Sequence, residues 1–144
     1  MLKRLSILAV FSALVLAGCV ASPEPAEDDR LYQALGEREG IERIVEDMLI
    51  RVTDDVRIAH YFRGIPLGDL RDELADQFCE LAGGPCEYTG RDMREAHEDL
   101  DLSRADFNAL VEHLIAAMER HHVRVPDQNR LLAKLAPMER DMVD

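Results

Sequence analysis

The sequence contains none of the short motifs that identify several common catalytic and nucleotide-binding sites. It has no His-Glu-x-x-His pair, its three cysteines lack the spacing of a zinc ribbon, and no glycine-rich phosphate loop is present. No internal repeat is visible, and no run of four or more residues alternates clearly between apolar and polar, as a half-buried strand requires. These absences argue against zinc and nucleotide sites of those types and favour an all-α fold.

Aromatic residues are also scarce, at 5% of the chain, so each phenylalanine needs a reason. Phe62 follows Tyr61 in a predicted non-helical corner between two helices. An aromatic side chain in such a corner can simply fill the core, and the corner is also a place where a flat macrocycle fits. The residues alone leave both interpretations open.

The first 18 residues are typical of a targeting segment. Lys3 and Arg4 precede an apolar run, residues 5–16, that is too short to span a bilayer and ends in small residues. The four residues from Leu16 to Cys19 resemble the lipobox of bacterial lipoproteins, and this resemblance implies that Cys19 is lipidated and becomes the first mature residue. A plain secretory signal and an uncleaved anchor are the alternatives.

The mature chain that this prediction implies is strongly acidic. Removal of residues 1–18 from the 144-residue chain leaves 126 residues, and it takes Lys3 and Arg4 from the 17 basic residues, so 15 face 29 acidic residues for a net charge of −14. This charge argues against nucleic acid and against electrostatic membrane binding. Residues 19–29 are mostly Ala, Ser, Pro, Glu and Asp and predict a flexible tether, followed by one domain from 30 to 144. Because Val20 is not an aspartate, lipoprotein sorting favours a periplasm-facing outer-membrane protein over an inner-membrane one.

Apolar residues recur at helical spacing through the rest of the chain. They predict helices over about 38–53 and 67–81, a short helical segment over 93–100, and a long helix that begins after Ser103, with Asp106 placed to cap it. Pro126 opens a last helix, which Pro137 should kink. The loop from Gly83 to Arg91 has little helical pattern and is long for a simple bundle, so something else is expected beside it.

Cys79 and Cys86 stand seven residues apart on either side of a Gly-Gly-Pro turn. In an oxidising periplasm this pair can form a disulfide across a helix end and its turn. Two free thiols are the alternative, because the Cα separation decides and the sequence does not contain it.

Among five histidines, His97 is the candidate for chemistry. It lies on the apolar side of the short segment between the irregular loop and Ser103, where a hydrogen-bonded core histidine and a metal ligand are both consistent with the pattern. A ligand imidazole needs an acceptor for its second N–H, and the backbone carbonyl near Met93, one turn earlier, is in the right place. His121 and His122 are expected at an exposed helix end.

An ordered set of motifs resembles the group I truncated haemoglobins over residues 31–143. Residues 31–36 (LYQALG) are similar to that family's opening, residues 61–64 (YFRG) to its aromatic corner, and residues 83–90 (GGPCEYTG) to its glycine-proline and tyrosine-glycine loop. Residues 93–97 (MREAH) are similar to the stretch that ends in its proximal iron ligand, and Phe107 follows ten residues later, as in the family.

The resemblance implies a truncated globin fold, a two-over-two helical sandwich around haem b, with His97 as the iron ligand. It also implies a set of residues around the cofactor. Phe62 packs on the porphyrin, Met93 and Tyr88 line its proximal side or edge, and Leu110 and Leu114 close the pocket from the long helix.

The departures from the family pattern lie on the ligand side. The family commonly has a tyrosine donor where this chain has Leu49, and polar helpers where it has Leu70 and Leu74, while Glu73 replaces a basic residue found in some members. Gln77 is one turn beyond Leu74 and is the remaining candidate donor. Because bound O2 carries partial negative charge that a donor stabilises by about 1 kcal/mol, an apolar ligand side predicts fast O2 escape, with CO and NO less affected.

Three functions follow as hypotheses. The first is a lipid-anchored haem protein that binds O2, NO or CO. The second is an enzyme, an NO dioxygenase or weak peroxidase, that depends on an external electron donor. The third is a haem-free helical lipoprotein that binds a protein partner. The gas-binding protein is favoured over the enzyme, because the tyrosine donor that the family commonly has on the ligand side is missing.

Overall fold

The computed structural model describes residues 29–143. The predicted targeting segment, Cys19, Val20 and all of the predicted tether except Asp29 lie outside the described residues. Within residues 29–143 there is no strand, and no helix there is long and apolar enough to cross a membrane. The elements, with 3₁₀ helices written η, are α1 (Asp29–Ala34), α2 (Glu37–Asp54), η1 (Ala59–Phe62), α3 (Leu67–Leu81), α4 (Met93–His97), α5 (Arg104–Arg120), α6 (Val125–Leu135), η2 (Ala136–Met138) and α7 (Glu139–Met142).

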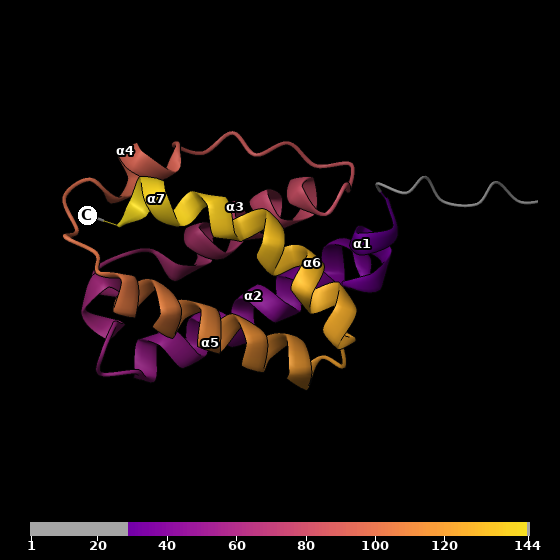
Figure 1. The fold of residues 1–144 in the computed structure, drawn as a ribbon, viewed down its shortest axis with the longest axis horizontal. Coiled ribbons are helices and arrows are strands. Elements are labelled where there is room, and N and C mark those ends of the chain that lie inside the picture. The colour runs from indigo at the N-terminus through magenta and orange to yellow at the C-terminus, as the bar shows by residue number, and fades with distance from the viewer. Residues whose placement is uncertain (1–28, 144) are drawn as a thin grey trace, which may run out of the picture.

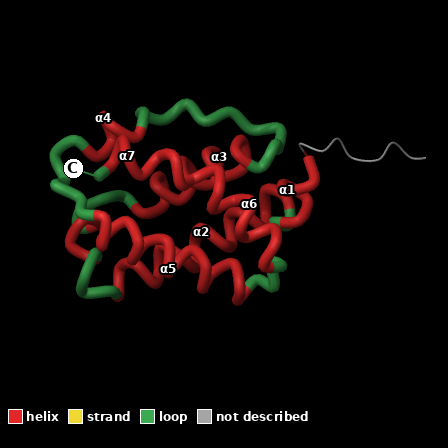
Figure 2. The backbone as a smooth tube through the Cα atoms, in the orientation of Figure 1, coloured by secondary structure: helices red, strands yellow, loops and turns green. Residues whose placement is uncertain are grey.

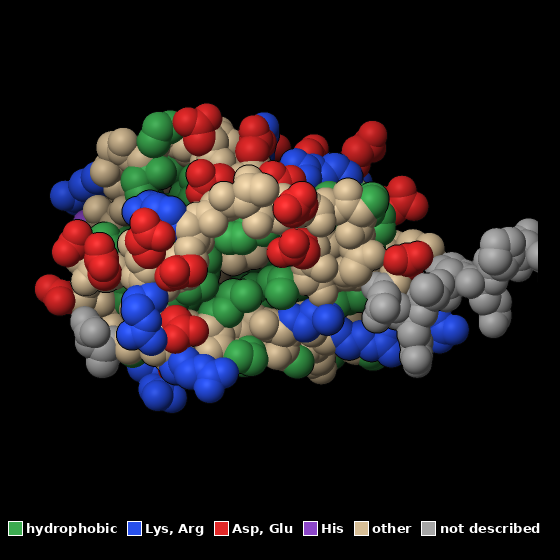
Figure 3. Space-filling view, turned by 90° about the horizontal axis from the view of Figure 1, so that it is seen from above, with side chains coloured by type: hydrophobic (Ala, Val, Ile, Leu, Met, Phe, Trp, Pro, Cys, Tyr) green, Lys and Arg blue, Asp and Glu red, His purple; other side chains and the backbone are tan. Residues whose placement is uncertain are grey.

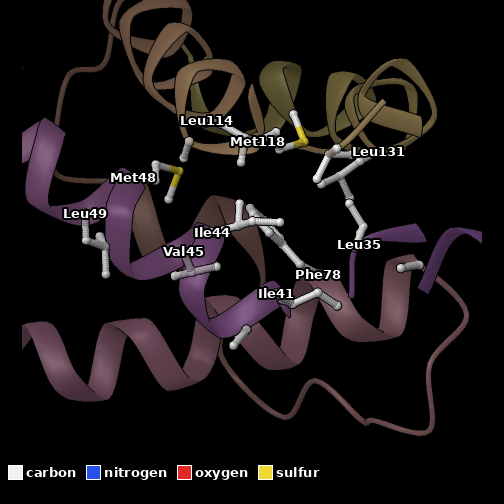
Figure 4. Packing of buried hydrophobic residues seen from close by; sticks show 14 of the residues in the cluster. Leu35, Ile41, Ile44, Val45, Met48, Leu49, Phe78, Leu114, Met118 and Leu131 are labelled. Atoms are coloured by element: carbon white, nitrogen blue, oxygen red, sulfur yellow. The ribbon is translucent and has the colours of Figure 1, made fainter. Parts of the chain in front are cut away.

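Helix α2 is the centre of the fold and packs on both α3 and α5 (Figure 1). Its apolar residues recur every three or four positions, so they form one buried stripe. Figure 4 shows Ile44 and Met48 of this stripe among Phe78 of α3 and Leu114 of α5. Helix α6 contacts α1 and α3, and α7 contacts α4. The described helices therefore pack around α2 in two layers (Figure 1).

Helix α3 ends in a tight turn that its glycines make possible. The N–H of Gly84 donates to the carbonyl of Cys79 at 2.8 Å, and the N–H of Gly83, at a φ of 81°, donates to the carbonyl of Glu80 at 3.0 Å. This Schellman pattern satisfies carbonyls at the helix end. A Cβ on Gly84 would meet Cys79 Sγ at 2.6 Å, so a larger residue does not fit there.

The turn brings Cys79 and Cys86 together, and the structure joins them in a disulfide with a Cα–Cα distance of 5.8 Å. The bond fixes the start of the irregular segment that leads to α4, drawn as the long loop across the top of Figure 2. Cys79 is fully buried and Cys86 is half-buried. The loop is thus attached to the core at one end and continues into α4 at the other.

The predicted bounds of α2 and α3 and the predicted starts of α5 and α6 are confirmed within one residue. Ser103 caps α5 in a reciprocal capping box with Asp106, and Pro126 lies in the first turn of α6. Two details differ from the prediction. The short segment is helical only as far as His97, and the last helix does not continue through a kink at Pro137 but changes to the 3₁₀ helix η2 before α7 begins. Proline lacks the N–H that the continuous helix needs.

Candidate functional site

A cavity of about 550 Å³ lies between α3, α4, α5 and the C-terminal segment, with the η1 corner at one end. This volume is in the range of sites that hold a cofactor-sized molecule. Most of its lining is apolar, and its floor includes Met48 of α2 and Phe78 of α3. The space-filling view in Figure 3 shows hydrophobic side chains in hollows of one face, with Asp and Glu side chains on several sides of them. The cavity is suited to a large, flat, mostly apolar molecule.

His97 lies at the end of α4 and is half-buried against the cavity. Its Nδ1 is 2.7 Å from the carbonyl oxygen of Met93, four residues earlier. A carbonyl can only accept, so Nδ1 carries the proton and donates, which leaves Nε2 with a free lone pair. This is the arrangement of an imidazole that binds a metal through Nε2.

The other four histidines do not line the cavity. Nε2 of His113 lies 2.7 Å from Oδ2 of Asp55, at the C-terminal cap of α2, so this histidine links α5 to α2. His60 stacks beside Tyr61 in the η1 corner and is exposed. His121 and His122 follow the end of α5, as expected. Among the histidines of the described residues, His97 is therefore the one that can bind a metal held in the cavity.

The structure brings eight of the nine predicted cofactor-contacting residues together around the cavity. They are His97, Phe62, Met93, Tyr88, Leu70, Leu74, Leu110 and Leu114.

Leu49 is the exception among the nine. It is buried in the hydrophobic core and does not line the cavity, whereas Met48, one residue earlier, does. Consecutive helical residues point about 100° apart, and Figure 4 shows the two side chains leaving α2 in different directions. The prediction for Leu49 is corrected accordingly: the α2 side chain at the cavity is Met48.

Gln77 is a buried polar side chain in this apolar lining, with 6% of its surface exposed. Its amide Nε2 lies 3.6 Å from the sulfur of Met93, which is a weak acceptor. A buried amide with so weak a partner gains from a stronger acceptor placed beside Met93. The observation fits a cavity that holds a ligand with polar atoms, and it places Gln77 beside α4.

Tyr61 and Asp106 form a polar pair at another part of the lining. The Tyr61 hydroxyl donates to Oδ2 of Asp106 at 3.2 Å. Hydrogen bonds from Ser103 lower the pKa of the Asp106 carboxyl, with a smaller contribution from Tyr61, so it is ionised at neutral pH. Burial, and then the carboxylate, raise the pKa of Tyr61. The pair joins the η1 corner to the start of α5 and so fixes Phe62 beside the cavity.

Sequence reasoning did not find the C-terminal part of the lining. Leu135, Met138 and Met142 all border the cavity, although they were expected only as the apolar stripe of a helix. Their spacing of three and four residues continues past Pro137, and this continuity was the available signal. Asp69 and Arg91 also line the cavity and were missed. The sequence does not distinguish a charged side chain at the edge of a cavity from one elsewhere on the surface.

Comparisons with known proteins identify the family. The model of the bacterial-like globin family matches residues 30–144. The chain belongs to this family. The globin is 32% identical over 110 residues to the Group 1 truncated hemoglobin GlbN of Synechocystis sp., covering 74% of this chain and 86% of that protein. It is 29% identical over 109 residues to the Group 1 truncated hemoglobin GlbN of Nostoc sp., covering 76% and 92%.

Solved structures agree with the sequence relatives. The globin is similar to the truncated hemoglobin from Tetrahymena pyriformis in its Fe(III) form, with a TM-score of 0.76 and 26% identity over 78% of this chain and 97% of that chain. The predicted all-α, two-over-two truncated globin fold is confirmed. Membership of the globin family implies a haem cofactor and haem-based binding of a gas such as O2. The apolar cavity, the free Nε2 of His97 and the weakly paired amide of Gln77 all fit this cofactor.

Proposed function

We propose that this globin holds haem b in the cavity and binds O2, NO or CO reversibly, with His97 Nε2 as the protein ligand to iron. The observation that carries the proposal is the hydrogen bond from His97 Nδ1 to the Met93 carbonyl at 2.7 Å. It fixes the tautomer and the plane of the ring in advance, and it increases the electron density on Nε2. Haem supplies the iron at which the gas binds.

The apolar lining positions the macrocycle and excludes water from it. Phe62 from the η1 corner, Phe107 and Leu110 from α5, and Met138 from the C-terminal segment approach from different elements. Burial of apolar surface contributes about 25 cal/mol per Å², so a porphyrin-sized face gains several kcal/mol from these contacts. The iron ligand therefore needs to provide only part of the affinity for haem.

The ligand side offers a bound gas little hydrogen bonding. Leu70 and Leu74 of α3 line the cavity where a polar helper is expected in the family, and Met48 is the nearest contribution of α2. Gln77 is directed to Met93, on the helix that carries His97. O2 gains most from a donor because its bound form is polarised, so we expect this globin to release O2 quickly and to retain CO and NO comparatively well.

Export and lipid anchoring form part of the proposal. Cys19, in the lipobox-like residues 16–19, is the proposed lipid attachment site, and Val20 favours the outer membrane. The disulfide between Cys79 and Cys86 supports export, because such bonds persist in oxidising compartments and are rare in the cytosol. Mass spectrometry of the membrane fraction tests the anchor, since Cys19→Ala should abolish the diacylglycerol modification.

Absorption spectra of the oxidised, reduced and CO-bound protein test the haem site. His97→Gly should shift the spectra and weaken haem binding, and added imidazole should restore them, because the free base fills the vacated position. His122→Asn is the matched control: His122 is exposed and has a φ of 59°, which asparagine tolerates. A colourless protein after reconstitution with hemin, or unchanged spectra in His97→Gly, would contradict the proposal.

Two alternatives predict other outcomes. An NO dioxygenase or weak peroxidase with an external electron donor predicts turnover of NO under O2, or of peroxide, when a reductant is added. A haem-free partner-binding lipoprotein predicts no Soret band at all.

A further inference from the structure

Gln77 of α3 and Met93 of α4 meet in the lining of the cavity, in a contact that leaves the amide poorly satisfied. Within residues 29–143 the buried Gln77 side chain makes one hydrogen bond, from Nε2 to the Met93 sulfur at 3.6 Å. Gln128, the other buried glutamine of these residues, donates to the carbonyl of Val123 at 2.9 Å. A thioether is a weak acceptor, so the Gln77 amide retains much of the cost of its burial.

Met93 is also open to a small molecule that enters the cavity. It lines the cavity and is half-buried, whereas Met48 and Met118 are buried in the core. Met138 and Met142 resemble Met93 in both respects, but no side chain of the described residues donates a hydrogen bond to their sulfurs. Met93 therefore combines access from the cavity with a buried N–H donor directed at its sulfur.

Hydrogen peroxide oxidises a thioether by transfer of one oxygen atom. A lone pair of the sulfur attacks one peroxide oxygen, the O–O bond breaks, and the hydroxide that leaves takes the proton of the transferred oxygen to become water. The sulfur loses two electrons, the peroxide gains them, and a sulfoxide results. A sulfoxide is polar and usually disrupts an apolar site, but its oxygen is a much stronger hydrogen-bond acceptor than the thioether sulfur.

We propose that Met93 is a site of oxidation by hydrogen peroxide and that the Gln77 amide binds the sulfoxide oxygen. The N–H that now donates weakly to the sulfur then has a strong acceptor in the same place. The new bond links α3 to α4 more firmly. Because the Met93 carbonyl accepts the N–H of His97, the oxidised chain keeps the imidazole in position. This consequence for haem rests on the proposed function, whereas the oxidation itself does not.

Mass spectrometry after brief exposure of the haem-loaded protein to hydrogen peroxide tests the proposal. Cleavage after glutamate places Met93 in residues 88–95 and puts Met138 and Met142 in two other peptides. The transferred oxygen gains negative charge as the O–O bond breaks, and a nearby donor stabilises that charge. Met93 should therefore be oxidised about fivefold faster in wild type than in Gln77→Leu, as expected for one neutral hydrogen bond. Met138 and Met142 are the internal controls and should react equally in both proteins.

The handedness of the sulfoxide separates a direct contact from a general effect of Gln77 on the cavity. The oxygen should be added on the side of the sulfur that faces the amide, so wild type should form mainly one of the two sulfoxide epimers. Two classes of methionine sulfoxide reductase each reduce one epimer. One class should therefore remove most of the oxygen from peptide 88–95 of wild type, and a clearly smaller share from that of Gln77→Leu.

Thermal unfolding measures whether the amide accommodates the sulfoxide. Peroxide should leave the melting temperature of wild type unchanged and lower that of Gln77→Leu by about 4 °C, the shift expected when one polar group is left without a partner. Oxidised Gln77→Leu should also lose haem to an excess of haem-free myoglobin faster than oxidised wild type. Met93→Leu is the matched control, because it keeps an apolar side chain that peroxide cannot oxidise.

Two results would overturn the inference. One is oxidation of Met93 at the same rate in wild type and Gln77→Leu, and the other is an equal yield of the two epimers in wild type. Both results are read from peptide masses, so they decide the inference even if wild type takes up no haem, in which case the proposed function fails separately. If His97→Gly shows the imidazole-dependent change while either result holds, only the role of Met93 and Gln77 fails.

Discussion

Removal of the disulfide between Cys79 and Cys86 should destabilise the fold by an amount that follows from the loop it closes. The two cysteines are seven positions apart, so the closed loop holds eight residues. In the chain-entropy model, closure of an eight-residue loop reduces the entropy of the unfolded state by about 8 cal/mol/K, which is about 2.5 kcal/mol at 25 °C. The entropy of unfolding of the 115 residues in 29–143 is about 2.1 cal/mol/K per residue, so the melting temperature should fall by roughly 10 °C.

Cys86→Ala is the suitable variant, because Cys86 is half-buried and the fully buried Cys79 keeps its sulfur in the core. Thermal unfolding of the ferric protein, followed by far-ultraviolet circular dichroism, measures the shift. Wild type treated with a phosphine reductant should melt close to Cys86→Ala, and the reductant should not change the variant further. If oxidised wild type and Cys86→Ala differ by less than a third of the expected shift, the loop is ordered by other contacts and the entropic reasoning is wrong.

Two further predictions concern the capping box and the ligand side. Ser103→Ala should lower the free energy of unfolding by about 1 kcal/mol in urea titrations, because it removes the N-cap of α5. Because Ser103 lowers the pKa of Asp106, the ionised carboxylate stabilises the fold above about pH 4, and this stabilisation is lost on further acidification. Ser103→Ala should therefore make the free energy of unfolding less dependent on pH in this acidic range. An equal pH dependence in both proteins would contradict this reasoning. Leu74→Gln should slow O2 escape after laser photolysis about fivefold by adding a donor, while Gln77→Leu should change it less than twofold; the reverse order would refute the orientation of Gln77 towards Met93.

The local features of this fold could be predicted because each depends on neighbouring residues. The apolar spacing in α3 and the pairing of Ser103 with Asp106 involve contacts within a few positions, and both agree with the structure. The acceptor for His97 was predictable for the same reason, since Met93 is one helical turn away. The family pattern supplied the rest of the predicted cavity residues.

Features that depend on tertiary geometry could not be predicted in this way. Whether Met48 or Leu49 faces the cavity depends on the orientation of α2 about its own axis, which its packing against α3 and α5 sets. Two adjacent apolar residues do not indicate that orientation. The 5.8 Å Cα separation that allows the disulfide results from the turn at Gly84. Met142 lines the cavity because α7 contacts α4, and this contact joins distant parts of the sequence.

The contact between α7 and α4 has a practical consequence for work on this globin. Helix α4 has only five residues and carries His97, and Arg94 ties it to Asp141 near the C-terminal end at 2.9 Å. A segment fused after Asp144 therefore follows Asp141, the partner of Arg94, by only three positions. Affinity tags fused there risk altering the spectra and gas-binding rates that the experiments measure, so a purification tag is better inserted ahead of α1.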